Sequence, residues 1–263
     1  MCLKSCQSFI NQGSTISYFQ QILSYLPRIS GLFLIMLWSM SSSASLRSFE
    51  AAYSSQWDLG ISLSGKAKRS LIKNQDGSYR LTTSASAMVA SLKESSLFYV
   101  KDDQILPVHY RYHRKILNKK RDVEVAFEWP KLKVENTAGG SSWVMDIVPG
   151  TLDKQSVQMR LQLDLAQIPA ASNSQPKTYS YDVADGGHLK TYSFTTDGED
   201  VIETPLGRYK AMRIKRDRGE ESERETWIWF APELDYTIVK IVQKEADGKR
   251  YQLNLVELNW LDP

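Results

Sequence analysis

The chain has 263 residues, of which 42% are hydrophobic and 24% are charged, an ordinary composition for a globular protein. It has 33 Lys and Arg against 30 Asp and Glu, but two of the basic residues, Lys4 and Arg28, precede residue 45, where no acidic residue occurs. The rest of the chain is nearly neutral, which excludes the strongly basic composition typical of nucleic-acid-binding proteins. We therefore expect no nucleic-acid partner.

The N-terminal segment predicts export. Gly31–Met40 is an unbroken apolar run, preceded by Arg28 and followed by small residues ending at Ala44. These are the features of a signal peptide cleaved after Ala44, with an uncleaved signal anchor as the alternative. The run is shorter than the roughly 20 residues of a transmembrane helix, so we expect no stable membrane span after cleavage. We predict a signal peptide over 1–44, whose length before Arg28 also fits an over-extended start, and a single periplasmic domain over 45–263.

Cysteine usage agrees with this interpretation. Cys2 and Cys6 both lie in the segment predicted to be removed, so the remaining chain needs no disulfide and has no thiol for catalysis. No cysteine follows the apolar run, and we expect no lipid attachment of the bacterial lipoprotein kind.

From Phe49 onward, strand patterns alternate with turns. Hairpin turns are predicted at Asp76-Gly77, Gly139-Gly140, Gly186-Gly187, Leu206-Gly207 and Asp247-Gly248. Roughly a dozen strands are too many for a flat open sheet. The predicted fold is mainly β, an antiparallel meander curled into a β-roll or barrel-like sheet packed around one central helix.

Three local details are also predicted. Ile105–Pro107 reads as a short strand of its own, followed by a strand over Val108–Leu117 and a basic turn over Asn118–Arg121. Pro169–Lys177 reads as a short linker. The tryptophans after the signal peptide, among them Trp129, all fall in strand-like runs.

The central stretch Gly150–Ile168 fits two periods. Its apolar residues alternate with polar ones as in a strand, but its Leu, Met, Gln, Arg and Ala residues are good helix formers, which favours a helix. Thr151 or Asp153 is the predicted N-cap. The helix would have two apolar faces, one with Val157, Leu161, Leu165 and Ile168 and the other with Met159 and Leu163. We therefore expect it to be buried between walls of the sheet.

No motif identifies a reaction. His109 and His113 are spaced like metal ligands, but Arg111 and Arg114 crowd them with positive charge, so we predict a surface strand there. Carboxylates such as Glu220-Glu221 lie in a charged turn, where a solvated surface is expected. The sequence has neither a Gly-x-Ser-x-Gly elbow nor a phosphate-binding glycine loop. We assign no catalytic residue, no metal and no cofactor.

Two pairs of residues are candidates for ligand binding. Asp153 and Ser156 lie one turn apart at the predicted helix start, where they could bind a polar ligand or cap the helix. Trp227 and Trp229 share one face of a strand whose other face is also apolar. They would either pack in the core or line an apolar cavity, as in ligand-holding barrels.

The residues from about Phe49 to Leu258 resemble a family of bacterial exported proteins known as domain of unknown function 3108. The resemblance rests on Tyr53–Gly65, Ile105–Pro107 with Tyr110, Leu152–Ser156, Glu203–Tyr209 and Trp227–Pro232, of which the last two are the most specific. It implies a spiral β-roll or barrel-like sheet enclosing a helix. It implies no established activity, so no catalytic residue is transferred.

Together these observations predict a non-enzymatic periplasmic protein that binds an apolar or amphiphilic, lipid-like envelope component or an envelope protein partner. One alternative is a hydrolase of envelope polymers that uses carboxylates such as Asp153, Asp182 and Glu203. The other is a structural or assembly factor of the cell envelope.

Overall fold

A computed structural model describes residues 46–58, 62–88, 90–167, 175–217 and 223–261. These residues belong to one compact unit, Ser43–Pro263. The predicted signal peptide, Ile168, most of the predicted linker and the Glu220-Glu221 pair lie outside the described residues. In the part that is described, no helix is both long and apolar enough to cross a membrane.

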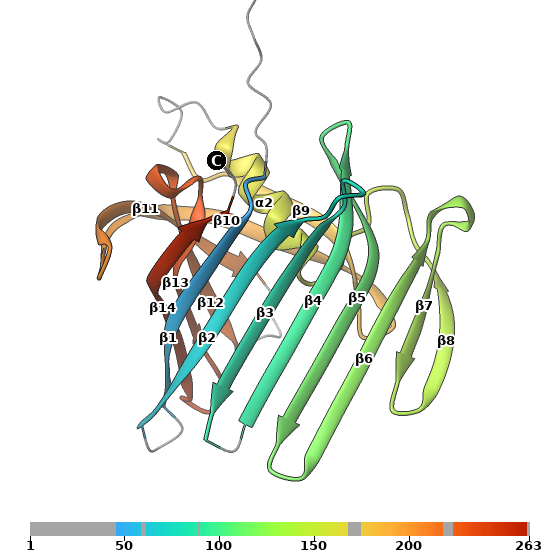
Figure 1. Cartoon of the computed structure of the whole chain (residues 1–263), viewed down its shortest axis with the longest axis horizontal. Helices are drawn as coiled ribbons and strands as arrows, with labels where there is room; N and C mark the ends of the chain where they lie inside the picture. The colour runs from blue at the N-terminus through green and yellow to red at the C-terminus, as the bar shows by residue number, and fades with distance from the viewer. Residues whose placement is uncertain (1–45, 59–61, 89, 168–174, 218–222, 262–263) are drawn as a thin grey trace, which may run out of the picture. The chain divides into compact units, whose positions relative to one another are not determined.

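Fourteen strands form one antiparallel sheet (Figure 1). They are β1 (Phe49–Asp58), β2 (Ser62–Lys73), β3 (Tyr79–Ala87), β4 (Ala90–Lys101), β5 (Gln104–Ile116), β6 (Lys119–Glu128), β7 (Lys133–Ala138), β8 (Ser141–Asp146), β9 (Thr178–Asp185), β10 (His188–Thr204), β11 (Gly207–Asp217), β12 (Glu225–Ala231), β13 (Thr237–Lys244) and β14 (Arg250–Trp260). Two short 3-10 helices, η1 (Trp129–Lys131) and η3 (Pro232–Leu234), follow β6 and β12.

The sheet is a meander in two arms. Its order runs from β8 back to β1, then from β14 back to β9, so that β1 and β14 join the arms and β8 and β9 are the two edges. Because β8 and β9 do not pair with each other, the sheet is curled but not closed. The predicted antiparallel meander and mainly β fold are confirmed, as are the five predicted hairpins.

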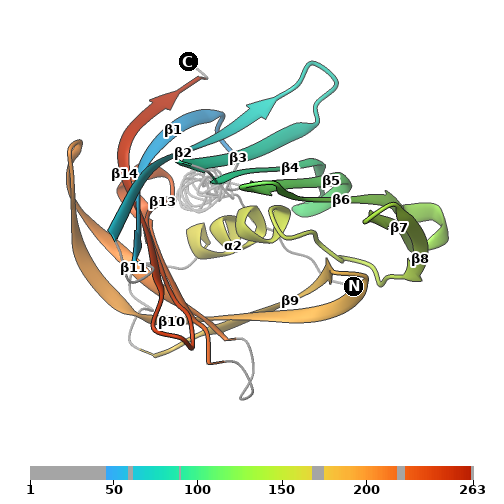
Figure 2. The same ribbon diagram turned by 90° about the horizontal axis from the view of Figure 1, so that it is seen from below.

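The central stretch forms helix α2 (Ser156–Ala166), and the strand alternative is wrong. Figure 2 shows α2 on the concave side of the curled sheet, between the two arms. The helix begins later than predicted because the residues before it are used differently. Leu152 pairs in parallel with Val183 of β9, donating its N–H to the Asp182 carbonyl at 2.8 Å.

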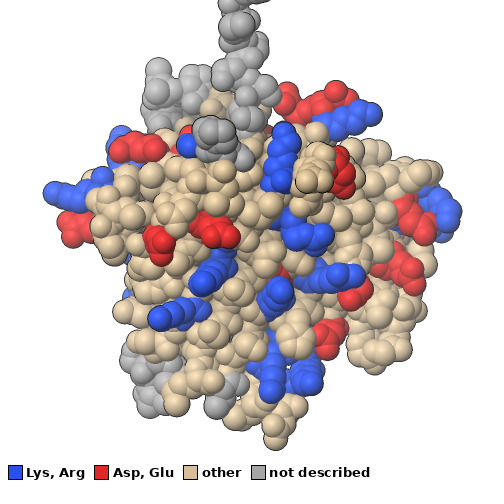
Figure 3. Space-filling view, viewed as in Figure 1, with Lys and Arg blue, Asp and Glu red and all other residues tan. Residues whose placement is uncertain are grey.

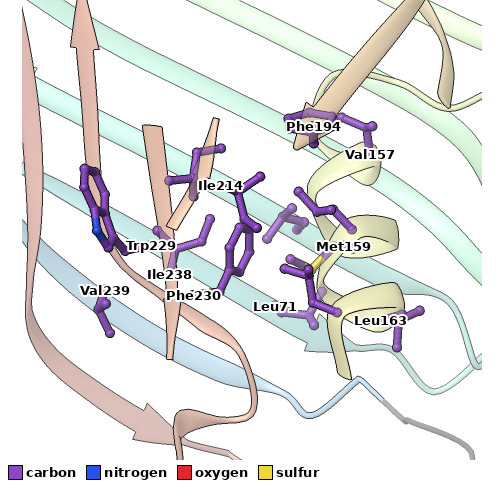
Figure 4. Close-up of a cluster of buried hydrophobic side chains, with 14 of the residues drawn as sticks. Leu71, Val157, Met159, Leu163, Phe194, Ile214, Trp229, Phe230, Ile238 and Val239 are labelled. Atoms are coloured by element: carbon purple, nitrogen blue, oxygen red, sulfur yellow. The ribbon is translucent and has the colours of Figure 1, made fainter. Parts of the chain in front are cut away.

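Both apolar faces of α2 are buried, as expected for a helix between walls of the sheet. The buried apolar side chains are Val157, Met159, Leu161, Leu163 and Leu165. In Figure 4, Phe230 extends from β12 toward Met159, with Ile214 beside it. Burial of a Leu, Met or Phe side chain contributes about 1.5–3 kcal/mol, so this cluster is a main source of stability.

Three details of the prediction are wrong. Ile105–Pro107 is the beginning of β5 and not a separate strand, and a register shift between Leu97 and Phe98 of β4 accommodates the irregularity. The predicted basic turn belongs largely to β6, which begins at Lys119. Trp129 lies in η1 because Pro130 follows it, and a proline favours the first turn of a helix.

Candidate functional site

The structure separates the two predicted pairs of ligand-binding residues. Asp153 and Ser156 lie on the concave side with no exposed surface, at the start of α2. Trp227 and Trp229 lie on the opposite, outer face of β12. Figure 4 shows Trp229 pointing away from α2, whereas Phe230 points toward it. The two pairs therefore cannot form one site.

Asp153 caps the first turn of α2. Its Oδ1 accepts the backbone N–H of Gln155 at 2.8 Å and of Ser156 at 2.9 Å, and its Oδ2 accepts the Ser96 hydroxyl at 2.5 Å. Ser156 Oγ in turn accepts the Asp153 N–H at 2.9 Å, the reciprocal arrangement of a capping box. Thr151, the other predicted cap, instead donates its hydroxyl to the Val148 carbonyl at 2.7 Å.

A polar network extends from this cap to the sheet. Gln155 Nε2 donates to Glu94 Oε2 of β4 at 2.7 Å, and Thr83 of β3 donates to Gln155 Oε1 at 3.0 Å. The Tyr110 hydroxyl of β5 donates to the other oxygen of Glu94. The start of α2 is thus tied to three neighbouring strands by hydrogen bonds, most of whose groups are buried.

Burial also changes the acid–base properties of this region. Desolvation raises the pKa of Asp153 to about 6, against the opposing effect of the hydrogen bonds from Ser96, Ser156 and Gln155. Desolvation and the nearby Glu94 charge raise the pKa of Tyr110. A carboxyl with a raised pKa can serve in acid–base catalysis. Asp153, however, has no exposed surface and its two oxygens are occupied, so its geometry fits a structural role.

Arg69 of β2 is a buried cation near the same network. Its Nη1 donates to Gln158 Oε1 of α2 at 2.6 Å, and its Nη2 has no hydrogen-bond partner among the described residues. Desolvation lowers the pKa of Arg69, and the nearby Tyr53 and Glu94 oppose that shift. This hydrogen bond fixes the first turn of α2 against β2.

Trp227 and Trp229 lie in a row of cations on the outer face. Antiparallel pairing places Lys215 of β11 opposite Trp227, and Lys240 of β13 opposite Trp229. Lys215 Nζ lies 5.7 Å and Lys244 Nζ lies 5.3 Å from the centroid of the Trp227 ring, and Lys240 Nζ lies 5.0 Å from that of Trp229. These distances fit cation–π contacts. We call these five residues the tryptophan face.

The two tryptophans differ in how firmly they are held. Trp229 is only 8% exposed, and its Nε1 donates to Asp200 Oδ2 at 2.7 Å. Arg213 donates to the same oxygen at 2.9 Å. Trp227 is half-buried, and its ring nitrogen donates no hydrogen bond to any of the described residues. Trp229 is therefore a fixed support, whereas the ring of Trp227 is partly accessible to a ligand.

A shallow hollow of about 460 Å³ lies over the tryptophan face. Its lining includes both tryptophans, Val242, four cationic residues and a single carboxylate: Arg213, Lys240, Lys244, Arg250 and Asp197. Four hollows of about 330 to 460 Å³ are lined by described residues, and none of the four is lined by a residue of α2. The arrangement can accept an apolar group on the indole ring beside an anionic group.

Sequence reasoning missed the cations of this face. Lys240 and Lys244 lie on one face of β13, with Val242 between them, and Arg213 and Lys215 share one face of β11. That spacing shows that each strand has a face with cations. It does not show which strands are neighbours, and the neighbours place these charges beside the tryptophans.

The predicted metal-ligand pair has other partners. His113 Nδ1 lies 2.5 Å from Asp122 Oδ1, and His109 Nε2 lies 3.4 Å from Glu124 Oε2, both carboxylates belonging to β6. Among the described residues, no three His, Cys, Asp or Glu side chains gather in a way that could hold a metal ion. The two histidines thus take part in cross-strand pairs on the outer face.

The carboxylates considered for a hydrolase are also engaged separately. Asp182 accepts the Thr191 hydroxyl at 3.1 Å, and Glu203 lies 3.4 Å from Arg208 across a hairpin. Asp153 caps α2. Each carboxylate has a local structural partner, and the geometry gives no specific support for a catalytic pair.

Comparison with known protein families identifies the family to which this chain belongs. The chain matches the model of the family described as "Protein of unknown function (DUF3108)" over residues 50–256, which confirms the resemblance noted from the sequence. No curated protein matches the chain.

Several solved structures match the chain, among them the following two. One is the beta-barrel-like protein of domain of unknown function DUF1849 from Brucella abortus, at 11% identity and a TM-score of 0.55, covering 82% of this chain and 99% of that chain. This likeness shows the fold alone. The other, MucB in complex with MucA(peri), is 10% identical and covers 84% of this chain and 96% of that chain. Its TM-score of 0.18 carries no argument.

Proposed function

We propose, from the premise that the chain belongs to the family of proteins of unknown function DUF3108, that this domain binds an amphiphile with an anionic group on its tryptophan face and catalyses no reaction. The observation that carries the proposal is the hollow in which two indole rings are surrounded by cations. Export, predicted from the N-terminal segment, would expose this face to amphiphiles of the cell envelope.

The chemistry of the face supports an amphiphile rather than a purely apolar or purely ionic ligand. The half-buried Trp227 offers a large apolar surface, and apolar contact contributes about 25 cal/mol per Å² removed from water. Lys240 and Lys244 supply charge within reach of the rings. A ligand with an acyl chain and an anionic head would use both kinds of contact at once.

The binding site in this proposal lies on the outside of the sheet. An apolar cavity lined by the tryptophans was one sequence-based expectation, but both rings lie on the outer face, and the concave side beside them is packed against α2. The hydrolase and assembly-factor alternatives are favoured by no specific observation, and we do not develop them.

The proposal is tested with lysophosphatidylglycerol as an anionic probe and lysophosphatidylcholine as a zwitterionic one, both below their critical micelle concentrations. Isothermal titration calorimetry should show tighter binding of the anionic probe. Trp227→Ala should weaken binding of both probes about tenfold, the loss of roughly 1.4 kcal/mol of apolar contact. Lys240→Gln with Lys244→Gln should instead remove the preference for the anionic probe.

Trp143→Ala is the matched control, because Trp143 of β8 is also partly exposed, at 37%, but lies outside the tryptophan face. It should bind both probes like the wild type. Equal losses in Trp143→Ala and Trp227→Ala, or wild-type protein that binds neither probe, would refute the proposal. Circular dichroism checks that each variant is folded.

A further inference from the structure

The outer face of β2, β3 and β4 has cations and no carboxylate. Lys66 and Lys68 of β2, Arg80 of β3 and Lys93 of β4 are all exposed. The only acidic residue of these three strands, Glu94, faces the concave side and binds Gln155. Figure 3 shows Lys and Arg side chains gathered over this part of the sheet.

These four cations differ from the paired cations of the other arm. There, three outer cations are paired with carboxylates of the same or a neighbouring strand: Lys210–Glu199, Arg213–Asp197 and Lys215–Glu225. Lys66, Lys68, Arg80 and Lys93 have no ion-pair partner among the described residues. Like charges that are not compensated repel one another, so an anionic partner would relieve that repulsion.

Hydroxyl groups stand between these cations. The register places Ser84 of β3 directly between Lys68 of β2 and Lys93 of β4. Since neighbouring strands lie about 4.8 Å apart, the two lysine Cα atoms are roughly 10 Å apart. In the adjacent row, Thr82 stands opposite Ser95. The face therefore alternates cations with groups that both donate and accept hydrogen bonds.

The surface between these side chains is hollowed. One hollow of about 400 Å³ is lined by Lys68, Thr82, Ser84 and Lys93, among others, and a second of about 330 Å³ by Arg80, Thr82, Lys93 and Ser95, among others. Because Thr82 and Lys93 line both, the two hollows form one shallow trough across the strands. Carboxylates occur only toward its ends, on β1, β14 and β6.

We propose that this trough binds an acidic polysaccharide. The cations would pair with carboxylate, sulfate or phosphate groups along the polymer, and the Ser and Thr hydroxyls would exchange hydrogen bonds with sugar hydroxyls. A membrane surface fits less well, because interfacial binding relies on aromatic and apolar side chains that insert among the lipids, whereas the positions between these cations bear hydroxyls. The proposal does not depend on the tryptophan face.

The test uses dextran sulfate as the probe and uncharged dextran of the same length as its control. The wild type should bind dextran sulfate with an affinity that falls as salt is raised, and should not bind dextran. Lys68→Gln, Arg80→Gln and Lys93→Gln combined should weaken binding about tenfold, as expected from losing three exposed ion pairs.

The control variant is Lys119→Gln, Lys120→Gln and Arg121→Gln combined, which removes the same charge from the exposed hairpin between β5 and β6. It should weaken binding less than twofold. Equal losses in both variants would show that only net charge matters and would overturn the proposal. Equal wild-type affinity for duplex DNA, or for vesicles of phosphatidylglycerol, would overturn the assignment to a polysaccharide.

Discussion

Replacing Asp153 by Asn is expected to stabilise the protein at neutral pH, although Asp153 caps α2. The pKa of its carboxyl rises from 3.8 to about 6 on folding because the group is buried. At 1.36 kcal/mol per pH unit, this change corresponds to about 3 kcal/mol. The folded-state pKa is raised, so the stability contributed by the protonated form is complete below pH 3.8 and is lost as the pH rises through about 6.

Asparagine keeps the hydrogen bonds and removes the charge. Its Oδ1 can still accept the N–H groups of Gln155 and Ser156, and its amide can donate to Ser96. The wild type and Asp153→Asn should therefore be similarly stable near pH 3.5, and Asp153→Asn should be more stable by about 1–3 kcal/mol near pH 7. Asp153→Ala should lose about 1–3 kcal/mol for each buried donor left unpaired.

Urea unfolding followed by circular dichroism between about pH 3.5 and 7.5 measures these differences. The quantity of interest is the free energy of unfolding of Asp153→Asn minus that of the wild type, because the other titrating groups cancel in it. A difference that stays constant with pH, or a less stable Asp153→Asn at neutral pH, would refute the reasoning. Either result would mean that the charged carboxylate gains more from its hydrogen bonds than it loses by burial.

Three further predictions concern packing and backbone conformation. Leu161→Asp places a charge where the side chain is 0% exposed and should unfold the domain, while Leu161→Ala should cost about 2–5 kcal/mol in thermal or urea unfolding; a folded Leu161→Asp variant would show that α2 is peripheral. Gly248→Ala should lower the free energy of unfolding by about 1 kcal/mol, and Gly187→Ala should lower it by more. Both glycines have φ near +80°, but only at Gly187 would the added methyl group meet an indole ring, at 2.5 Å. Equal losses in urea unfolding would contradict this. Tyr110→Phe should cost about 1–3 kcal/mol, and a double-mutant cycle with Glu94→Gln should show coupling; additive losses would mean that the bond contributes nothing.

The fold could be predicted largely because its turns have local causes. Residue pairs such as Asp76-Gly77 and Asp247-Gly248 supply the positive φ that a tight hairpin needs. The helix was favoured over a strand by residue type. Of the two predicted N-caps, Asp153 accepts the backbone N–H groups at the helix start. Thr151 does not, because the adjacent Leu152 pairs with Val183, a contact between distant residues that leaves no local signal.

The division of β5 failed for a related reason. Pro107 looks like a strand breaker because it has no N–H to donate. In the structure it pairs with Phe98 next to a register shift in the β4–β5 pair, and a bulge of this kind tolerates proline within a strand. Only the partner strand shows that the interruption is local.

The candidate site was predictable to the same limited extent. Alternation placed Trp227 and Trp229 on one face of β12, but both faces of that strand are apolar in sequence, so alternation could not show which is outer. Figure 4 shows it, because Phe230 of β12 points toward α2 and Trp229 points away from it. Which cations lie beside the tryptophans depends on which strands are neighbours, and the order of the strands is a property of the whole sheet.

The position of α2 explains why both proposed binding surfaces are on the outside. Side chains that face the helix must pack against it, and a core that loses or gains even one methylene group is destabilised. Outward-facing side chains are free of that constraint.

The two surfaces lie on different arms, one on β2–β4 and one on β11–β13, with β1 and β14 between them. Because they share no residue, changes at one surface should leave binding at the other unaltered. Trp227→Ala should therefore bind dextran sulfate like the wild type, and the combined change of Lys68, Arg80 and Lys93 should leave lysophosphatidylglycerol binding unchanged.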